Sequence, residues 1–117
     1  MNQIKNLSLI GIFMAFVVIA LGAWTRLVDA GLGCPDWPGC YGFVFWPNDE
    51  AEIALAESRF PMFPYDINKA IPEQVHRLFA ASLGLLAIIL VYLSFNKTNN
   101  KSMHRWSAFL LLLICCQ

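Results

Sequence analysis

Two long stretches without a charged side chain constrain this chain more than any other feature of its sequence. Residues 6–25 and 78–96 contain no Asp, Glu, Lys or Arg, and most of their side chains are apolar. Twenty helical residues rise by about 30 Å, the thickness of the hydrocarbon core of a bilayer. The chain is 58% hydrophobic and only 14% charged, which excludes an ordinary soluble domain. Its eight basic and eight acidic residues balance, so we expect no nucleic-acid partner.

The two stretches predict an all-α integral membrane protein with a lipid bilayer as its surroundings. The first is too long for the apolar region of a signal peptide, so we expect a retained helix. Pro72 fits the first turn of a helix, which puts the start of the second helix there. A third apolar run ends after about 17 Å of helix, too short to cross a bilayer, which predicts an N-terminal fragment of a longer multi-pass protein. The expected partial domain, 1–117, comprises helix 1 at about 6–26, an outer loop at 27–71, helix 2 at about 72–95, an inner loop at 96–105 and a truncated helix 3 at 106–117.

The basic residues predict the orientation of these helices. The short 96–105 connection carries Lys97, Lys101 and Arg105, whereas the long stretch 26–71 spreads three basic residues among seven acids. Short loops rich in Lys and Arg stay in the cytoplasm. We therefore expect a cell inner (cytoplasmic) membrane protein whose N-terminus is cytoplasmic and whose 27–71 loop lies outside.

The outer loop contains a cysteine pair in a tightly turned segment. Cys34 and Cys40 have five residues between them, among several glycines and prolines. On the oxidising side of the membrane such a pair can close a small disulfide ring. The residues alone leave open whether that disulfide is structural or redox-active.

An acidic segment follows within the same loop. Asp49 and Glu52 have the spacing of a capping box, and Ile53, Ala56 and Phe60 fall on one helical face. This pattern predicts a short amphipathic helix on the outer surface. A solvated acidic helix packed on the rest of the loop is the alternative.

The strongest candidates for chemistry stand at the start of the second predicted span. Glu73 and His76 are three residues apart and so share a helix face. Ionisable residues in a membrane segment are functional candidates. At about 100° per residue the same face carries Ala80, Gly84 and Ala87, small residues that leave room for a neighbouring helix or a flat macrocycle. A simple ion pair between Glu73 and Arg77 is the structural alternative.

Arg26 ends the first span at the depth where the second begins. Arg26 and Arg77 can both bind anionic groups there, such as porphyrin carboxylates. An interfacial anchor to lipid phosphate explains Arg26 equally well from the sequence. His104 is expected to be a solvated residue of the inner loop.

Two strings then resemble a known family. LGAWTRLVDAGLGCPDWPGCYG (21–42) is similar to the helix 1 exit and first outer loop of haem A synthases, and EQVHRLFAASLGLL (73–86) to their second helix. The resemblance implies eight membrane helices in two four-helix halves, of which this chain is the N-terminal part of one. It implies oxidation of the C8 methyl of haem O to a formyl group, which makes haem A for terminal oxidases.

The resemblance also implies roles for single residues. His76 would be an axial ligand of the iron of the substrate haem O, Glu73 a catalytic acid beside the reacting haem, and Cys34 and Cys40 the outer-loop cysteine pair of one subgroup. Haem b would be the cofactor of the missing C-terminal half, so the fragment alone is expected to be inactive. Haem O synthase and terminal-oxidase assembly factors are the expected protein partners, and a homo-oligomer is left open.

Two alternatives remain at this stage. One is a membrane thiol–disulfide oxidoreductase that uses Cys34 and Cys40, although the spacing is not Cys-x-x-Cys. The other is a small structural or assembly subunit whose acidic outer loop binds a partner.

Overall fold

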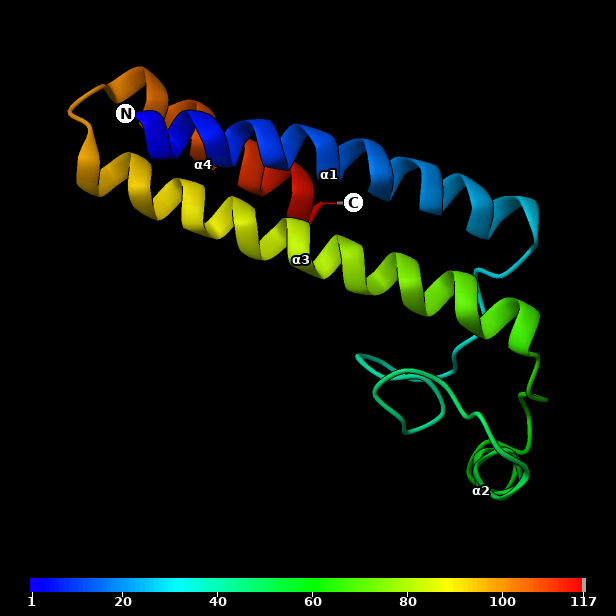
Figure 1. The fold of residues 1–117 in the computed structure, drawn as a ribbon. Coiled ribbons are helices and arrows are strands. Elements are labelled where there is room, and N and C mark those ends of the chain that lie inside the picture. The colour runs from blue at the N-terminus through cyan, green and yellow to red at the C-terminus, as the bar shows by residue number, and fades with distance from the viewer. Residues whose placement is uncertain (117) are drawn as a thin grey trace. The chain divides into compact units, whose positions relative to one another are not determined.

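The chain is helical on either side of one long irregular connection. A computed structural model describes residues 1–116. Its helices are α1 (Asn2–Leu27), α2 (Glu50–Arg59), α3 (Ile67–Lys97) and α4 (Lys101–Cys115), as labelled in Figure 1. The two long helices, α1 and α3, are long and apolar enough to cross a membrane. Within the described residues the only β-type pairing is an isolated bridge between Cys40 and Phe43.

The helix α3 begins five residues before Pro72, where the sequence predicted its start. Asp66 explains the difference, because its side-chain Oδ1 accepts the N–H of Asn68 at 2.9 Å and its carbonyl accepts the N–H of Ala70 at 2.9 Å. An aspartate in this position satisfies N–H groups that the first turn leaves without partners. Pro72 therefore lies inside the helix, and the outer connection ends earlier than residue 71.

The helix α4 also begins earlier than expected, at Lys101 rather than residue 106. Asn100 is its N-cap, and the side-chain oxygen accepts the N–H of Ser102 at 2.9 Å. His104 consequently lies in this helix and not in a solvated loop. Its ring stacks on Phe95, with centroids 4.4 Å apart, and its Nε2 lies 2.9 Å from the Thr98 carbonyl oxygen.

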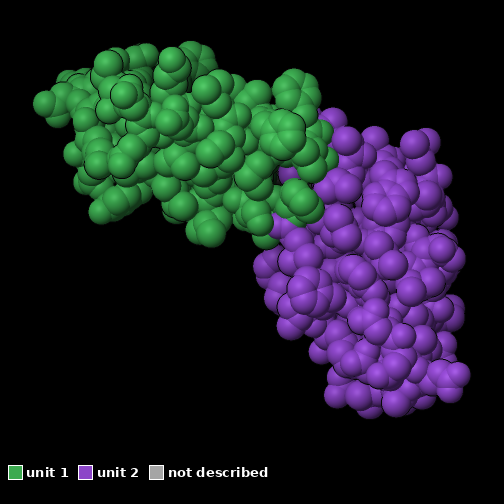
Figure 2. Space-filling model, viewed as in Figure 1, with its two compact units in different colours: residues 1–17, 79–117 green, residues 18–78 purple. Residues whose placement is uncertain are grey.

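The chain forms two compact units, coloured separately in Figure 2. The first contains residues 1–17 and the chain from residue 79 onward. Here Gly11 faces Leu86, since a Cβ added to it would lie in ordinary contact, 3.4 Å, with a methyl carbon of that side chain. Lys97 also donates a hydrogen bond to the Gln3 side chain at 3.0 Å.

The second unit, residues 18–78, contains the outer connection and has its own core. Tyr41 is at its centre, with edge-to-face contacts to Phe60 at 5.8 Å and Tyr65 at 5.3 Å between ring centroids. The buried members are Cys34, Cys40, Tyr41, Ala56 and Ala70, and the partly buried ones are Phe43, Trp46, Phe60 and Tyr65.

The short helix α2 adds to this core. Asp49 is its N-cap, and its carboxylate accepts the N–H of Glu52 at 2.8 Å, while the Glu52 side chain accepts the N–H of Asn48 at 2.8 Å. Ala56 is the buried residue of the helix. The cap thus starts α2 where Ala56 can face the aromatic cluster.

Candidate functional site

A pocket in the second unit brings together two of the residues singled out from the sequence. His76 and Arg26 both line it, and its volume is about 500 Å³. His76 comes from α3 and Arg26 from the last turn of α1. The other lining residues are apolar, small or hydroxylic: Ile19, Gly22, Ala23, Thr25 and Gly31. The pocket therefore holds one imidazole and one permanent cation on otherwise uncharged walls.

The His76 ring lies directly against the backbone of α1. A Cβ added to Gly22 would lie 3.1 Å from His76 Cε1, which is tighter than ordinary contact. Only glycine leaves this space to the imidazole without a shift. The Nδ1 atom of His76 is buried and has no hydrogen-bond partner. Because a buried polar atom without a partner is costly, His76 has an unused capacity to bind.

Thr25 joins the two helices that line the pocket. Its hydroxyl lies 2.9 Å from the Leu21 carbonyl oxygen and 3.3 Å from the Pro72 carbonyl oxygen. Thr25 is 7% exposed, so these contacts are shielded from water. The hydroxyl fixes the end of α1, and with it Arg26, beside the first turns of α3.

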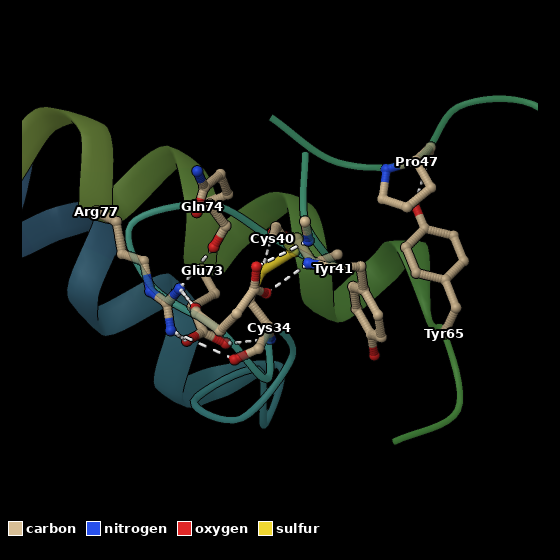
Figure 3. The surroundings of a disulfide bond; sticks show 12 residues. Cys34, Cys40, Tyr41, Pro47, Tyr65, Glu73, Gln74 and Arg77 are labelled. Atoms are coloured by element: carbon tan, nitrogen blue, oxygen red, sulfur yellow. Dashed lines mark hydrogen bonds and ion pairs between the residues drawn. A yellow bond between two sulfur atoms is a disulfide. The ribbon is translucent and has the colours of Figure 1, made fainter. Parts of the chain in front are cut away.

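Glu73 and Arg77 are brought to a different place, the disulfide loop (residues 34–44). Figure 3 shows both side chains beside the Cys34–Cys40 disulfide. One carboxylate oxygen of Glu73 accepts the N–H of Cys34 at 3.0 Å, and the other forms an ion pair with Arg77. Glu73 is only 6% exposed, so this is a buried attachment of the loop to α3.

Arg77 extends this attachment with its remaining terminal hydrogens. Its Nη1 donates to the carbonyls of Asp36 at 2.6 Å and Gly39 at 3.1 Å, and its Nη2 donates to the Cys34 carbonyl at 3.4 Å. Together with the bond to Glu73, all four Nη hydrogens have acceptors. The guanidinium fork suits this work, because it presents several donors in fixed directions.

Gln74 completes the attachment, and the sequence reasoning missed it. Its Nε2 donates to the carbonyls of Pro38 at 3.2 Å and Val44 at 2.7 Å. The residue is completely buried, and its Oε1 has no partner. No sequence pattern predicts a role for a neutral amide between Glu73 and His76. Only its place in the fold reveals that it holds the middle of the loop, at Pro38, and its end, at Val44.

Asp36 shapes the loop from within, and it too was missed. Its two carboxylate oxygens accept the N–H groups of Tyr41 at 2.5 Å and Gly42 at 2.7 Å. Both residues have positive φ, 55° and 82°, which is unusual for a tyrosine. The paired hydrogen bonds compensate this conformation. The Asp that follows Pro35 was the one available signal, since Pro-Asp pairs are common in turns.

The tyrosine hydroxyls of this unit are held in their neutral form. Burial, and then the carboxylates of Asp66 and Asp36, raise the pKa of Tyr41. Burial and the neighbouring Tyr41 raise the pKa of Tyr65. Each hydroxyl donates to a carbonyl, Tyr41 to Pro64 at 3.2 Å and Tyr65 to Pro47 at 2.6 Å. Both are therefore structural donors.

The small residues predicted to continue the His76 face do not line this pocket. Ala80, Gly84 and Ala87 belong to the first unit. A Cβ at Gly84 would meet nothing within 4 Å, and Ala87 lines a separate pocket of that unit.

The pocket beside His76 suits a metal ion that is bound in a cofactor and takes most of its ligands from that cofactor. Within residues 1–116, no three His, Cys, Asp or Glu side chains gather as a site for a free ion. Haem iron needs only axial ligands from the protein, and a histidine is the common one. The imidazole of His76, the cation of Arg26 and the uncharged walls therefore fit a haem.

Comparison with known proteins points the same way. A model of the COX15-CtaA family, described as cytochrome oxidase assembly protein, matches residues 5–117. The chain is also 40% identical over 115 residues to a heme A synthase of Shewanella oneidensis. That alignment covers 98% of this chain but 34% of the relative, so the chain spans about a third of its length. No solved structure matches.

Proposed function

Because the chain belongs to the COX15-CtaA family of cytochrome oxidase assembly proteins, we propose that it is the N-terminal part of a haem A synthase. The whole protein would oxidise the C8 methyl of haem O to a formyl group. One observation carries the proposal: His76 and Arg26 line the same pocket, whose other walls are uncharged. Membership supports a role in haem A biosynthesis, and the pocket supplies residues for the substrate.

In this proposal His76 binds the haem O iron through a neutral imidazole. Gly22 keeps the ring in place, because any side chain at that position would displace it. Ile19 and Ala23 offer apolar surface to the porphyrin. The iron provides the redox chemistry when haem O is bound, whereas the chain provides position and charge.

Arg26 is the proposed partner of the porphyrin carboxylates. The sequence left Arg26 and Arg77 as equal candidates, and their contacts support the choice of Arg26. All four Nη hydrogens of Arg77 already have acceptors in the loop and Glu73, whereas Arg26 lines the pocket. A carboxylate that bound Arg77 through Nη would have to displace one of those acceptors.

Glu73 remains the proposed acid near the reacting group. It lies one helical turn before His76 on α3, although its carboxylate contacts the disulfide loop and does not line the His76 pocket. Its contacts with Cys34 and Arg77 give it a structural duty as well. Glu73→Gln keeps the size and an acceptor oxygen but removes the charge. We expect this variant of the full-length protein to retain haem O and fail to form haem A. Normal formation of haem A would show that Glu73 has only a structural role.

The ligand role is tested by a pair of histidine variants in the full-length protein. His76→Ala should weaken haem O retention, and His76→Met should restore part of it, since a thioether also binds haem iron. His104→Ala is the matched control, because His104 stacks on Phe95 in the other unit. Pigment extraction and haem chromatography on quantified protein measure the outcome. Equal losses in both alanine variants would contradict the proposal.

A pair of glycine variants tests the pocket without touching a ligand. Gly22→Ala places a methyl group against the imidazole, whereas Gly84→Ala meets open space. We expect the first to shift the haem absorption bands or lower occupancy, and the second to leave both unchanged. Identical spectra for Gly22→Ala and the parent protein would contradict the placement of haem beside His76.

The setting proposed from the sequence also stays part of this proposal. The protein would cross the inner membrane several times, with its N-terminus in the cytoplasm and the outer connection outside. Haem b would bind downstream of this chain, and haem O synthase and oxidase assembly factors would be its partners. Single cysteines in the connection of a cysteine-free variant should react with an impermeant reagent on intact cells. Reaction only after permeabilisation would reverse the orientation.

The thiol–disulfide alternative gains no such support. Cys34 is 5% exposed and Cys40 is fully buried, whereas disulfide exchange needs an accessible sulfur. The burial favours a structural disulfide that closes the loop held by Glu73 and Arg77.

A further inference from the structure

A second pocket, remote in sequence from the His76 site, lies in the first unit. Its volume is about 240 Å³, and its walls come from α1, α3 and α4. No charged side chain lines it. The lining consists of Ile4, Ser8, Ala87, Leu90, Ser94, Met103, Trp106, Ser107 and Leu110.

Ser94 is the feature of this pocket that packing does not explain. The residue is 2% exposed, and its Oγ is buried without a hydrogen-bond partner. A serine hydroxyl in a helix ordinarily bonds the carbonyl four residues earlier, which Ser94 does not do. A buried hydroxyl without a partner costs about 1–3 kcal/mol. A ligand oxygen in the pocket would remove that cost.

The remaining hydroxyls show what the ligand must offer. Ser107 donates its hydrogen to the His104 carbonyl at 3.1 Å, so its oxygen is left as an acceptor. Ser94 still has a hydrogen to donate. Ser8 adds a third hydroxyl to the lining. The pocket thus presents serine hydroxyls that donate and accept on apolar walls, which suits a neutral molecule that carries carbonyl or hydroxyl oxygens.

The size of the pocket and its aromatic lining narrow the class of ligand further. An apolar cavity of about 150 Å³ can hold benzene, so this pocket accommodates one substituted six-membered ring and not a tetrapyrrole. Trp106 offers an aromatic face to the pocket.

We propose that this pocket binds the head group of a membrane-soluble quinone or quinol. A quinone carbonyl accepts from Ser94, and a quinol hydroxyl donates to Ser107. The proposal concerns binding alone and does not depend on the haem reaction proposed for the His76 pocket.

The test uses the full-length protein in nanodiscs and a photoreactive azido-benzoquinone with a decyl tail. Mass spectrometry should locate the label in peptides that contain residues 87–94 or 103–110. Excess unlabelled decyl-benzoquinone should abolish the labelling. At subsaturating probe, Ser94→Ala should lower the labelling about threefold to tenfold, the loss expected for one hydrogen bond. Ala87→Leu should fill the pocket and prevent labelling.

Ser102→Ala is the matched control, because Ser102 is exposed in the first turn of the same helix as Ser107. The Ser102→Ala variant should be labelled to the same extent as the parent protein. If Ala87→Leu fails to fold, Ser94→Ala still tests the proposal. Equal labelling in Ser94→Ala, equal competition by a phospholipid, or no labelling of these peptides would each overturn the proposal. Haem retention, measured on the same samples, reports separately on the His76 pocket.

Discussion

The disulfide loop and the helix α1 are stabilised in opposite ways. Within 34–44 the backbone is held by side-chain hydrogen bonds, an ion pair and a disulfide. In α1 the buried residues are Ile4, Val18 and Thr25, whereas large side chains such as Phe13 and Phe16 are 70% and 69% exposed. A loop without regular structure needs a specific partner for each polar group, whereas a helix satisfies its own backbone and leaves its side chains to the bilayer. Single changes should therefore have large effects in the loop and small ones in the helices.

Arg77→Gln should give the largest effect. It removes the partner of a buried carboxylate and the donors for three loop carbonyls. Breaking a buried ion pair costs about 3–5 kcal/mol. Arg105→Gln, at an exposed position in the second turn of α4, should cost under about 0.5 kcal/mol. Hydrogen exchange of loop peptides in the full-length protein measures the difference, and similar protection in both variants would contradict the comparison.

Removal of the disulfide should have the second-largest effect on stability. A Cys34→Ser/Cys40→Ser double variant should destabilise the loop by about 2–3 kcal/mol through chain entropy. The free cysteines 115 and 116 are exposed, so their replacement by serine is the control with little effect. The bond from the Cys34 N–H to Glu73 survives the change, which limits the loss. Intact-mass analysis after alkylation checks the premise, because two free thiols in oxidised membranes would disprove it.

Loss of an N-cap should destabilise α2, in the outer connection, and α4 by similar amounts. Asp49→Ala in the outer connection and Asn100→Ala before α4 each remove an N-cap. Each should cost about 1 kcal/mol, because the capping hydrogen bond is the same in both. Exchange rates in the first turns of α2 and α4 measure this, and a several-fold larger cost at Asp49 would show that its cap also supports the loop core.

The smallest expected effect concerns alkaline pH. Since the pKa of Tyr41 is raised in the folded loop, its contribution to stability is complete below about pH 10, the unfolded value, and is lost as pH rises through the folded pKa. Tyr41→Phe should flatten this dependence and cost about 1 kcal/mol through the unpaired Pro64 carbonyl. Tyr92→Phe is the control, since Tyr92 is 66% exposed on α3. Phenolate absorbance during a pH titration reports the ionisation. If the stability of Tyr41→Phe depended on pH as in the parent protein, another group would be responsible.

The sequence by itself determined the helical spans and the family. Uncharged stretches of bilayer length need no tertiary contact to be recognised, because helix length and transfer free energy are local properties. The cysteine spacing likewise predicted the disulfide that the structure contains. Element ends were less certain, because Asp66 and Asn100 act as caps through single side-chain contacts that no periodicity reveals.

Only the tertiary structure decided which of the candidate residues lie together. The sequence placed Glu73, His76 and Arg77 within one helical turn and a half, yet the fold directs His76 to a pocket with Arg26 and the other two to the disulfide loop. Gln74 and Ser94 were invisible beforehand, because a neutral amide or hydroxyl becomes informative only when burial leaves one of its atoms without a partner. Burial depends on residues distant in the chain, and for that physical reason no local pattern could have revealed it.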